Sequence, residues 1–338
     1  MAVVGLGALG NELVRQLGLL GVGEALLVDP DRVEESNLAK CVFFRLAGAV
    51  GRFKAEVLAE AGREWFPETR WIPVRAEVAD VGWARLSGRQ VLFAGVDRES
   101  ARLEIARIST RLNIPVCDGG LDTGGAGGRV SWYPGAGGAC HGCRLTAARR
   151  REWLQSWSSV AHPCRVPQEP GGWTATPQLA AVTAALQVHF AVEWLGRGEG
   201  EGRSVEFRLE EPLRLEEIRL AVNEACPFHT AEERPLAPIA GPFRDALAEG
   251  EAACWEWPVC LKARCLDCGH EWRPLVRAVR LRREGLCPQC GGRRLLELDT
   301  RAGVARDDPL AARRPEELGL PPEHLYSIRK GRKREESE

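Results

Sequence analysis

Short apolar runs alternate with segments of helical periodicity through most of the first 230 residues of the chain. The apolar runs have the length of buried strands, and the segments between them repeat apolar residues every three or four positions. The predicted strands are AVVGLG, EALLVD, RWIPVRAEV, QVLFAGVD and IPVCDGGL, which begin at residues 2, 24, 70, 90 and 114. The predicted helices are NELVRQLGLLG, FKAEVLAEAGREW and ESARLEIARISTRL. This alternation predicts an α/β protein with a Rossmann-like, doubly wound and mostly parallel sheet.

A change of pattern after residue 145 indicates how the rest of the chain is organised. Residues 145–173 are polar, contain several tryptophans and are interrupted by prolines, which is typical of a crossover segment. A long apolar helix follows in TPQLAAVTAALQVHFAVEWLG, with Pro177 near its first turn. The next stretch is rich in proline and alanine and lacks periodicity, which is typical of a linker. The predicted parts are a large α/β domain, this linker, a small module and a charged tail, at residues 1–230, 231–250, 251–300 and 301–338.

Composition and charge argue against several classes of protein. The chain has 338 residues, with 46 Lys and Arg against 47 Asp and Glu, so its formal net charge is -1. A nearly neutral chain has no strong field that would attract nucleic acid or a membrane surface. We see no apolar run long enough to span a membrane and no secretory leader. We therefore expect a cytoplasmic protein that contacts neither a membrane nor nucleic acid.

A glycine-rich turn follows the first predicted strand, in AVVGLGALGNELV. Its glycines, Gly5, Gly7 and Gly10, permit a tight turn and a close approach of the backbone to a phosphate. The N-terminus of the helix that follows adds partial positive charge. Asp29 ends the second predicted strand, where it suits the hydroxyl groups of a ribose. These residues alone fit a redox dinucleotide as well as ATP.

The next segments favour ATP. Asp31 and Asn37 lie in VDPDRVEESNLAK, which ends at Lys40, and Lys54 follows in FKAE. The fourth predicted strand ends at Asp97. The two lysines could neutralise phosphates, and Asp97 could hold Mg2+, a hard ion that prefers carboxylate oxygens. Singly, Asp31, Asn37 and Lys40 fit loop caps, but together and in this order they predict a Mg-ATP site.

The twelve cysteines include three CxxC pairs, and a further cysteine begins a CxxH pair. In a chain without an export signal, this spacing indicates thiolates that bind Zn2+ rather than disulfides. The CxxH pair and the first CxxC pair supply four nitrogen and sulfur ligands for a structural tetrahedral zinc site. The ligands of this first predicted site are Cys140, Cys143, Cys226 and His229. The alternative is that His229 only caps a turn and the site holds no metal.

A zinc ribbon within residues 251–300 is the second predicted zinc site. Its ligands are Cys265, Cys268, Cys287 and Cys290. Glycine follows each of these two pairs and suits the turn of a zinc knuckle. Because so small a module has little core, zinc would supply much of its folding free energy, on the order of 10 kcal/mol. The ribbon is either purely structural or docks a partner.

The order of these motifs resembles that of the ThiF/MoeB/HesA adenylyltransferase superfamily, which includes the ubiquitin-activating enzymes. The matching segments are VVGLGALGNELV, VDPDRVEESNL, FKAE, GVDRESAR, IPVCDGGL and CHGC, and they cover roughly residues 2–230. The resemblance implies that the C-terminal glycine carboxylate of a ubiquitin-like protein attacks the α-phosphate of ATP. Pyrophosphate leaves and an acyl-adenylate forms. In the conjugating branch, a cysteine of the enzyme then takes the acyl group as a thioester.

The resemblance also implies roles for the nucleotide residues. The three glycines of the turn would surround the phosphates, Asp29 would contact the ribose, and Asp97 would bind Mg2+. The residues around the triphosphate would be Asp31, Asn37, Lys40 and Lys54. The family usually has arginine at the position of Lys40, so a point charge replaces the bidentate contact of a guanidinium group with phosphate.

Cys164, in VAHPCRVPQEPGGW, stands where the resemblance places the catalytic cysteine. The surrounding prolines favour an exposed loop, and His162 and Arg165 could favour the thiolate form, which is the nucleophile. Attack of a thiolate on an acyl-adenylate is favourable because AMP is a good leaving group. The alternatives are an inert loop cysteine and a metal ligand.

The segments GALGNE and TATPQLAAVTAALQV resemble prokaryotic members that serve ubiquitin-like conjugation systems, some of them in antiviral defence. The implied partners are a ubiquitin-like protein, a conjugating enzyme and a second copy of the chain in a homodimer. The zinc ribbon would then be the part that docks the conjugating enzyme.

Other functions stay open. A sulfur-carrier-protein adenylyltransferase of thiamine or molybdopterin synthesis would use the same ATP site without a stable thioester. A nucleic-acid-binding zinc-ribbon protein would use the basic segment RAVRLRREG, although the near-neutral charge and the ATP motifs speak against it. An NAD-dependent oxidoreductase ranks last, because no residues for hydride transfer accompany the glycine turn.

Overall fold

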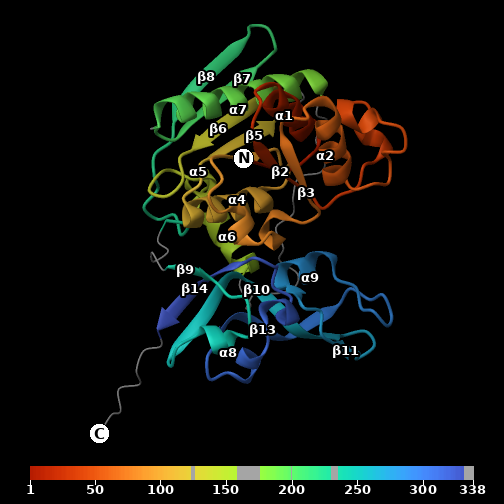
Figure 1. The fold of residues 1–338 in the computed structure, drawn as a ribbon, viewed down its shortest axis with the longest axis vertical. Helices are drawn as coiled ribbons and strands as arrows, with labels where there is room; N and C mark the ends of the chain where they lie inside the picture. Colours follow the sequence, from red (N-terminus) through yellow and green to blue (C-terminus); the bar gives the residue numbers. More distant parts are fainter. Residues whose placement is uncertain (123–125, 158–175, 199, 230–234, 331–338) are drawn as a thin grey trace. The chain divides into compact units, whose positions relative to one another are not determined.

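A computed structural model describes residues 1–122, 126–157, 176–198, 200–229 and 235–330 of the chain. The chain forms two compact units, which we call the N-terminal unit and the C-terminal unit (Figure 1). The N-terminal unit comprises Met1–Ala79, Leu86–Leu145 and Glu169–Ala231. The C-terminal unit comprises Asp80–Arg85, Thr146–Gln168 and Glu232–Glu338.

An eight-stranded sheet with the order β3-β2-β1-β4-β5-β6-β7-β8 forms the N-terminal unit. The strands are β1 (Ala2–Val4), β2 (Glu24–Val28), β3 (Arg70–Val74), β4 (Leu92–Ala94), β5 (Val116–Leu121), β6 (Gly127–Tyr133), β7 (Arg203–Arg208) and β8 (Arg214–Arg219). Neighbouring strands are parallel from β3 to β5 and antiparallel from β5 to β8. The predicted Rossmann-like α/β fold with a mostly parallel sheet is confirmed, and it carries an antiparallel extension at one edge.

The helices of this unit include α1 (Ala8–Leu19), α2 (Lys54–Trp65), α4 (Glu99–Leu112), α5 (His141–Arg144) and α7 (Pro177–Arg197). The connections β1-α1-β2 and β2-α2-β3 step along the sheet in one direction, whereas β4-α4-β5 steps in the other. Because such crossovers are right-handed, α1 and α2 cover one face of the sheet and α4 covers the other. The strand order reverses between β1 and β4, where doubly wound sheets bind ligands at the carboxyl ends of their strands.

Helix α7 is long and apolar enough to cross a membrane by length and composition alone. In the structure one side of it packs against α1 and against strands β5 and β6, with Leu179, Ala184 and Phe190 buried. The helix begins where Thr176 Oγ1 accepts a hydrogen bond from the N–H of Leu179, with proline in the first turn. It ends at Gly198, which has a left-handed conformation. The apolar residues of α7 thus belong to the core of the N-terminal unit.

A second sheet organises the C-terminal unit. Its strands are β9 (Leu236–Pro238), β10 (Glu251–Cys265), β11 (Glu271–Trp272), β12 (Val276–Arg277), β13 (Leu295–Ala305) and β14 (Leu325–Lys330). Strand β10 pairs antiparallel with β11, β12, β13 and β14, and every second residue along most of it is buried. Helices assigned to this unit are α6 (Ala147–Trp157), α8 (Phe243–Ala246) and α9 (Ala278–Glu284). The long alternating strand gives the unit a core of its own.

The structure differs from the sequence prediction in the extent of this unit. Residues 235–250, predicted as part of a linker, contribute Phe243 to the core. Residues 301–330, predicted as the start of a charged tail, contain the end of β13 and all of β14, with Tyr326 1% exposed. These short strands and turns have too few positions to show a regular pattern of apolar residues. Their composition alone therefore predicted a linker and a tail instead of folded structure. Residues 331–338 of the predicted tail lie outside the described residues.

Residues 80–85 belong to the C-terminal unit, although the sheet of the N-terminal unit precedes and follows them in the chain. Nε of Arg277 lies 2.5 Å from Oδ1 of Asp80, and Arg277 is 5% exposed. The ring of Trp83, 1% exposed, lies 5.9 Å from that of Trp257 and 5.2 Å from that of His324. A buried charge without its partner is costly, so this early segment is an integral part of the unit.

Replacing His324 with phenylalanine should make the protein less sensitive to acid. His324 is 5% exposed, and burial lowers its pKa from the usual 6.5 to about 4. The unfolded chain therefore binds a proton that the folded chain does not, so this residue destabilises the fold as the pH falls from 6.5 towards 4. The free energy of unfolding should fall over that range by about 3 kcal/mol more in the wild type than in the variant.

Urea unfolding at pH 7 and pH 4.5, followed by tryptophan fluorescence, measures this difference. The control is His189→Phe, which changes an exposed histidine on α7. Equal loss of stability in wild type and His324→Phe would show that His324 does not stay neutral in the fold.

Candidate functional site

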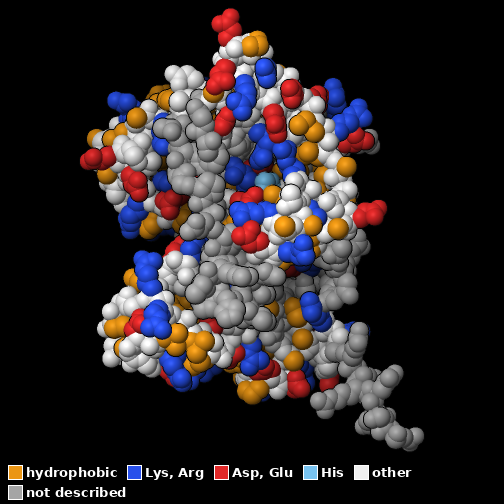
Figure 2. All heavy atoms as spheres, turned by 180° about the vertical axis from the view of Figure 1, so that it is seen from behind, with side chains coloured by type: hydrophobic (Ala, Val, Ile, Leu, Met, Phe, Trp, Pro, Cys, Tyr) orange, Lys and Arg blue, Asp and Glu red, His pale blue; other side chains and the backbone are white. Residues whose placement is uncertain are grey.

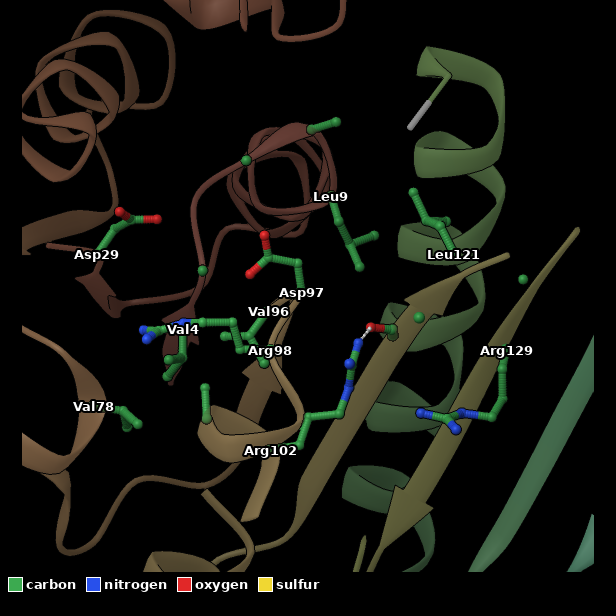
Figure 3. Close-up of a pocket in the computed structure, with 18 of the residues that line it drawn as sticks. Val4, Leu9, Asp29, Val78, Val96, Asp97, Arg98, Arg102, Leu121 and Arg129 are labelled. Carbon is green, nitrogen blue, oxygen red and sulfur yellow. Dashed lines mark hydrogen bonds between the residues drawn. The ribbon is translucent and has the colours of Figure 1, made fainter. Parts of the chain in front are cut away.

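A cavity of about 770 Å³ lies at the carboxyl ends of strands β1, β2 and β4 in the N-terminal unit and extends past β5 to β8. In Figure 3, Asp29 lies on one side of it, Asp97 near the middle, and Arg102 and Arg129 on the other side. This is the place where the strand order reverses, and a volume of this size suits a small-molecule ligand.

The glycine-rich turn between β1 and α1 borders the cavity. Gly5 has a φ of 86°, and a Cβ there would lie 2.7 Å from the carbonyl oxygen of Gly95. A Cβ at Gly10 would lie 2.3 Å from the carbonyl oxygen of Gly5, so both positions need glycine for the turn itself. Gly7 precedes α1 and lines the cavity, with open space where its side chain would be. The N-terminus of α1 therefore borders a space that a phosphate could occupy.

Asn11 holds this turn in place. Its side-chain amide donates hydrogen bonds to the carbonyls of Leu6 and Gly7 at 3.3 and 3.2 Å, and its Oδ1 accepts one from the N–H of Phe43 at 3.1 Å. Asn11 is 1% exposed, so these bonds satisfy a buried amide. Sequence analysis missed this residue, although a polar side chain on the apolar face of a predicted helix is a signal that could have identified it.

Asp29 and Asp31 follow β2, and both line the cavity. Asp29 is 5% exposed, and its carboxylate accepts hydrogen bonds from the N–H groups of Leu6 and Asp31 at 2.7 and 2.8 Å. Asp31 is exposed, and its Oδ2 lies 3.0 Å from Nζ of Lys54, the first residue of α2. Burial opposes the charged form of Lys54, but the carboxylates of Asp29 and Asp31 outweigh it and raise the pKa of Lys54. The ammonium group therefore stays charged beside the cavity.

Asn37, Lys40 and Asp97 also line the cavity. Oδ1 of Asn37 accepts a hydrogen bond from the N–H of Glu34 at 3.0 Å, which fixes the turn that carries it. The side chains of Lys40 and Asp97 make no hydrogen bond or ion pair with the part of the chain that the structure describes. The cavity thus collects the predicted nucleotide residues except Gly10, which shapes the turn from behind.

Three charged residues that sequence analysis missed form a network in the wall of the cavity. Asp118, on β5, is 2% exposed and accepts hydrogen bonds from Nε of Arg102 at 2.9 Å and Nη2 of Arg129 at 2.7 Å. Burial alone would raise the pKa of Asp118, but the two guanidinium groups hold it below its usual value. An aspartate inside a predicted buried strand was the available signal, because a buried carboxylate needs a charged partner.

The four residues of the first predicted zinc site come together in the N-terminal unit. Their ligand atoms, from Cys140, Cys143, Cys226 and His229, all lie within 4.8 Å of one another. Sγ of Cys140 lies 3.9 Å from that of Cys143 and 3.8 Å from that of Cys226. Tetrahedral zinc, with bonds of about 2.3 Å to sulfur, places two sulfurs about 3.8 Å apart. The ligand set and its spacing therefore fit zinc.

The second cluster lies in the C-terminal unit and consists of Cys265, Cys268, Cys287 and Cys290, again within 4.8 Å. The glycine after each pair is left-handed, with φ of 75° at Gly269 and 71° at Gly291. The N–H of each glycine donates to the carbonyl of the first cysteine of its own pair, at 3.0 and 2.9 Å. Sγ–Sγ distances across the pairs are 3.6 Å, so the two equivalent turns form a cluster that also fits zinc.

Cys164, the predicted acceptor cysteine, lies outside the described residues. Two other cysteines of the N-terminal unit are buried and lack the properties of a nucleophile. Burial raises the pKa of Cys41 to about 11 and that of Cys117 well above its usual value. Thiols with raised pKa values carry little thiolate at neutral pH, so neither residue competes with Cys164 for that role.

Comparisons with known proteins match the part of the chain that holds the cavity. The model of the ThiF family matches residues 1–227. Human ubiquitin-like modifier-activating enzyme 7 is 33% identical over 131 residues, which cover 35% of this chain and 12% of that protein. The Nedd8-activating enzyme E1 catalytic subunit of Drosophila melanogaster is 30% identical over 133 residues, covering 36% and 29%. The adenylyltransferase and sulfurtransferase uba4 of Aspergillus clavatus is 41% identical over 76 residues, covering 22% and 15%.

The matched segments thus span at most 29% of the length of these three curated relatives. Among solved structures, Escherichia coli MccB with ATP has a TM-score of 0.52 and 16% identity, covering 68% of this chain and 65% of that chain. The microcin C7 biosynthetic enzyme MccB in complex with N-formylated MccA has a TM-score of 0.54 and 16% identity, covering 68% and 66%. At this identity, the likeness to MccB shows a shared fold.

Proposed function

The chain belongs to the ThiF family, and from this premise we propose that it is an ATP-dependent adenylyltransferase for the C-terminal carboxylate of a ubiquitin-like protein. The observation that carries the proposal is the cavity at the reversal of strand order, which collects Gly7, Asp29, Lys54 and Asp97. We further propose that Cys164 receives the acyl group as a thioester. The acyl group would then pass to a conjugating enzyme of a bacterial conjugation system. The chain would act as a homodimer.

The geometry around α1 and α2 supports ATP as the nucleotide. The N-terminus of α1 offers backbone N–H groups and partial positive charge to phosphates. Lys40 and Lys54 add two ammonium groups on the side of β2, where Asp29 would contact the ribose and Asp31 would lie beside the triphosphate. Three phosphates need such compensation, because uncompensated charge in a partly enclosed cavity is costly.

Asp97 fits a ligand for Mg2+. It is exposed, lies just beyond the end of β4 and lines the cavity, and both of its oxygens are available. Bound Mg2+ would supply neutralisation of phosphate charge, and Asp97 would hold it. In the adenylation step, an oxygen of the substrate carboxylate forms a bond to the α-phosphorus. The bond from that phosphorus to its bridging oxygen breaks, and pyrophosphate leaves with the electron pair.

Both cysteine clusters fit structural zinc in the proposal. The first would tie the loop after β6 to residues 226–229, and the second would hold the two knuckles beside β10 and β13. Four ligands fill a tetrahedral zinc ion and leave no open position for catalysis. The second cluster would also be the part that docks the conjugating enzyme.

The test is intact-protein mass spectrometry without reductant, after the enzyme is mixed with Mg-ATP and a ubiquitin-like protein that ends in Gly-Gly. An adduct with the mass of the ubiquitin-like protein, which a thiol releases, should form on the wild type. Cys164→Ala should still release pyrophosphate but form no adduct, because the acyl-adenylate then lacks its acceptor. The matched control is Cys254→Ala, which should form the adduct. An adduct that survives in Cys164→Ala would refute the assignment of that residue.

A sulfur-carrier-protein adenylyltransferase is the second candidate, favoured by the match to the Aspergillus clavatus adenylyltransferase and sulfurtransferase. It would give AMP and pyrophosphate in the same experiment without a thiol-labile adduct on either variant.

The basic segment RAVRLRREG does not support a nucleic-acid-binding function. Its arginines pair with acidic residues: Arg277 with Asp80, Arg282 with Glu297 and others nearby. On the face that Figure 2 shows, basic and acidic side chains are interspersed. A nucleic-acid site needs unpaired positive charge along one surface, and these arginines do not provide it.

A further inference from the structure

The wall of the cavity beyond Asp97 carries two arginines that the proposed nucleotide site does not use. Arg102 extends from α4 and Arg129 from β6 (Figure 3). A Cβ placed on Gly120 of β5 would lie 3.4 Å from Nη2 of Arg102 and 3.5 Å from Nη2 of Arg129. The two guanidinium groups therefore converge over one glycine, where the absence of a side chain leaves room for a ligand.

One buried carboxylate anchors both arginines. Asp118 accepts hydrogen bonds from both, and Arg102 also donates to the carbonyl oxygen of Gly119 at 3.0 Å. Nε of Arg129 is buried and has no hydrogen-bond partner among the described residues. Two guanidinium groups against Asp118 leave a positive charge, since Glu206, opposite Arg129 on β7, is itself paired with Arg144. A guanidinium has five donor N–H groups, of which few are used here. The network is thus preorganised and still able to bind an anion.

The strand register places this pair beside the proposed metal ligand. Ala94 of β4 pairs with Asp118 of β5, so the chain beyond Ala94, which leads to Asp97, runs alongside Gly120. Asp29, which follows β2, lies on the other side of Asp97 (Figure 3), and Lys54 pairs with Asp31 two residues further along the chain from Asp29. An anion between the arginines would therefore lie across Asp97 from the lysine side of the cavity. In-line displacement at the α-phosphorus requires the carboxylate to approach opposite the leaving pyrophosphate, so with the pyrophosphate beside Lys40 and Lys54 the carboxylate would enter from the arginine side.

We propose that Arg102 and Arg129 bind the C-terminal carboxylate of the protein substrate before it attacks ATP, and that Asp118 is the positioning residue for both. This inference rests on the proposed adenylation. Charge-assisted hydrogen bonds from guanidinium to carboxylate are strong and directional. Gly119, Gly120 and Gly128 line that part of the cavity, so the main chain of a narrow glycine-ended tail can approach the strands there. Once the carboxylate has become a neutral acyl group, the arginines lose their anion and hold the tail less tightly.

The test compares two synthetic hexapeptides that end in Gly-Gly, one with a free carboxylate and one with a C-terminal amide. Binding to the full chain is measured by fluorescence anisotropy, with Mg2+ and a non-hydrolysable ATP analogue present. The wild type should bind the acid about tenfold or more tightly than the amide. Arg129→Gln should bind both equally, and Arg129→Lys should restore part of the preference because it keeps the charge but not the fork. Arg203→Gln, on the opposite face of β7 where Arg203 pairs with Glu193, should behave as the wild type.

Asp118→Asn separates positioning from folding. It should raise KM for the free-acid peptide about tenfold and change kcat less than about twofold, since the chemistry does not use Asp118 directly. Affinity for the ATP analogue should be unchanged in every variant. Equal binding of acid and amide by the wild type, or a preference that persists in Arg129→Gln, would overturn the inference. Failure of the proposed function is distinct: the wild type would select the acid but release no pyrophosphate from Mg-ATP.

Discussion

Replacing Asp97 with asparagine should lower the rate of ATP–pyrophosphate exchange by about a hundred- to a thousandfold, which is the cost of removing one charged group that acts in a transition state. The side chain of Asp97 makes no hydrogen bond or ion pair with the described part of the chain, so its charge is free for a ligand. The change keeps the size of the side chain and removes its charge. Mg2+ would be held more weakly, and the charge on the phosphates would be compensated less.

The lack of a side-chain partner for Asp97 among the described residues also makes the experiment easy to interpret. Because Asp97 is exposed and unpartnered within the described residues, asparagine should change the melting temperature little. Exchange is measured with a ubiquitin-like protein that ends in Gly-Gly, over a range of Mg2+ concentrations. The matched control is Glu216→Gln, an exposed acid of β8 at the far end of the same cavity, which should keep nearly full activity. Equal activity of Asp97→Asn and the wild type would remove Asp97 from the site.

Replacing Cys268 with serine should reduce bound zinc from two ions to one per chain and loosen the part of the C-terminal unit around the second cluster. Cys268 is exposed, so serine costs no packing and the effect reports the metal alone. Binding energies of structural zinc are on the order of 10 kcal/mol, which exceeds the stability of most small domains. We expect fast amide exchange in the knuckles and in the adjoining ends of β10 and β13.

Zinc is counted by native mass spectrometry, and exchange is followed by hydrogen–deuterium mass spectrometry. Cys254→Ser is the control, because it changes a cysteine of β10 that belongs to neither cluster. It should keep two zinc ions and slow exchange. Two zinc ions in Cys268→Ser would mean that Cys268 is not a ligand.

The fold of the N-terminal unit was predictable from sequence because parallel strands are buried on both faces and appear as continuous apolar runs. The glycine turn was predictable for a different reason. Only glycine tolerates the φ of Gly5 and the close approach of Gly10 to the carbonyl oxygen of Gly5. The turn can therefore be recognised from the positions of its glycines in the sequence. Acidic and basic residues that follow such strands collect at one edge of the sheet, which is why motif order pointed to the cavity.

The arginine network could not be predicted in the same way, because it depends on how the consecutive elements α4, β5 and β6 pack and pair. Asp118 and Arg129 meet because β5 and β6 pair antiparallel, and Arg102 reaches them from a helix on one face of the sheet. No spacing in the sequence encodes that pairing. The prediction for the extent of the C-terminal unit was wrong for a related reason. Strand β9 has only three residues, and the buried positions of β14 do not alternate. Both strands are specified by pairing, β14 with β10 and β9 with β14.

The place of residues 80–85 in the C-terminal unit has a consequence for synthesis on the ribosome. Trp83 is made long before its ring partners Trp257 and His324. During that interval the ring of Trp83 and the carboxylate of Asp80 are exposed without their partners. The nascent chain therefore exposes this segment until residue 324 has left the ribosome, and a chain truncated before residue 324 would leave the segment permanently accessible to chaperones and proteases.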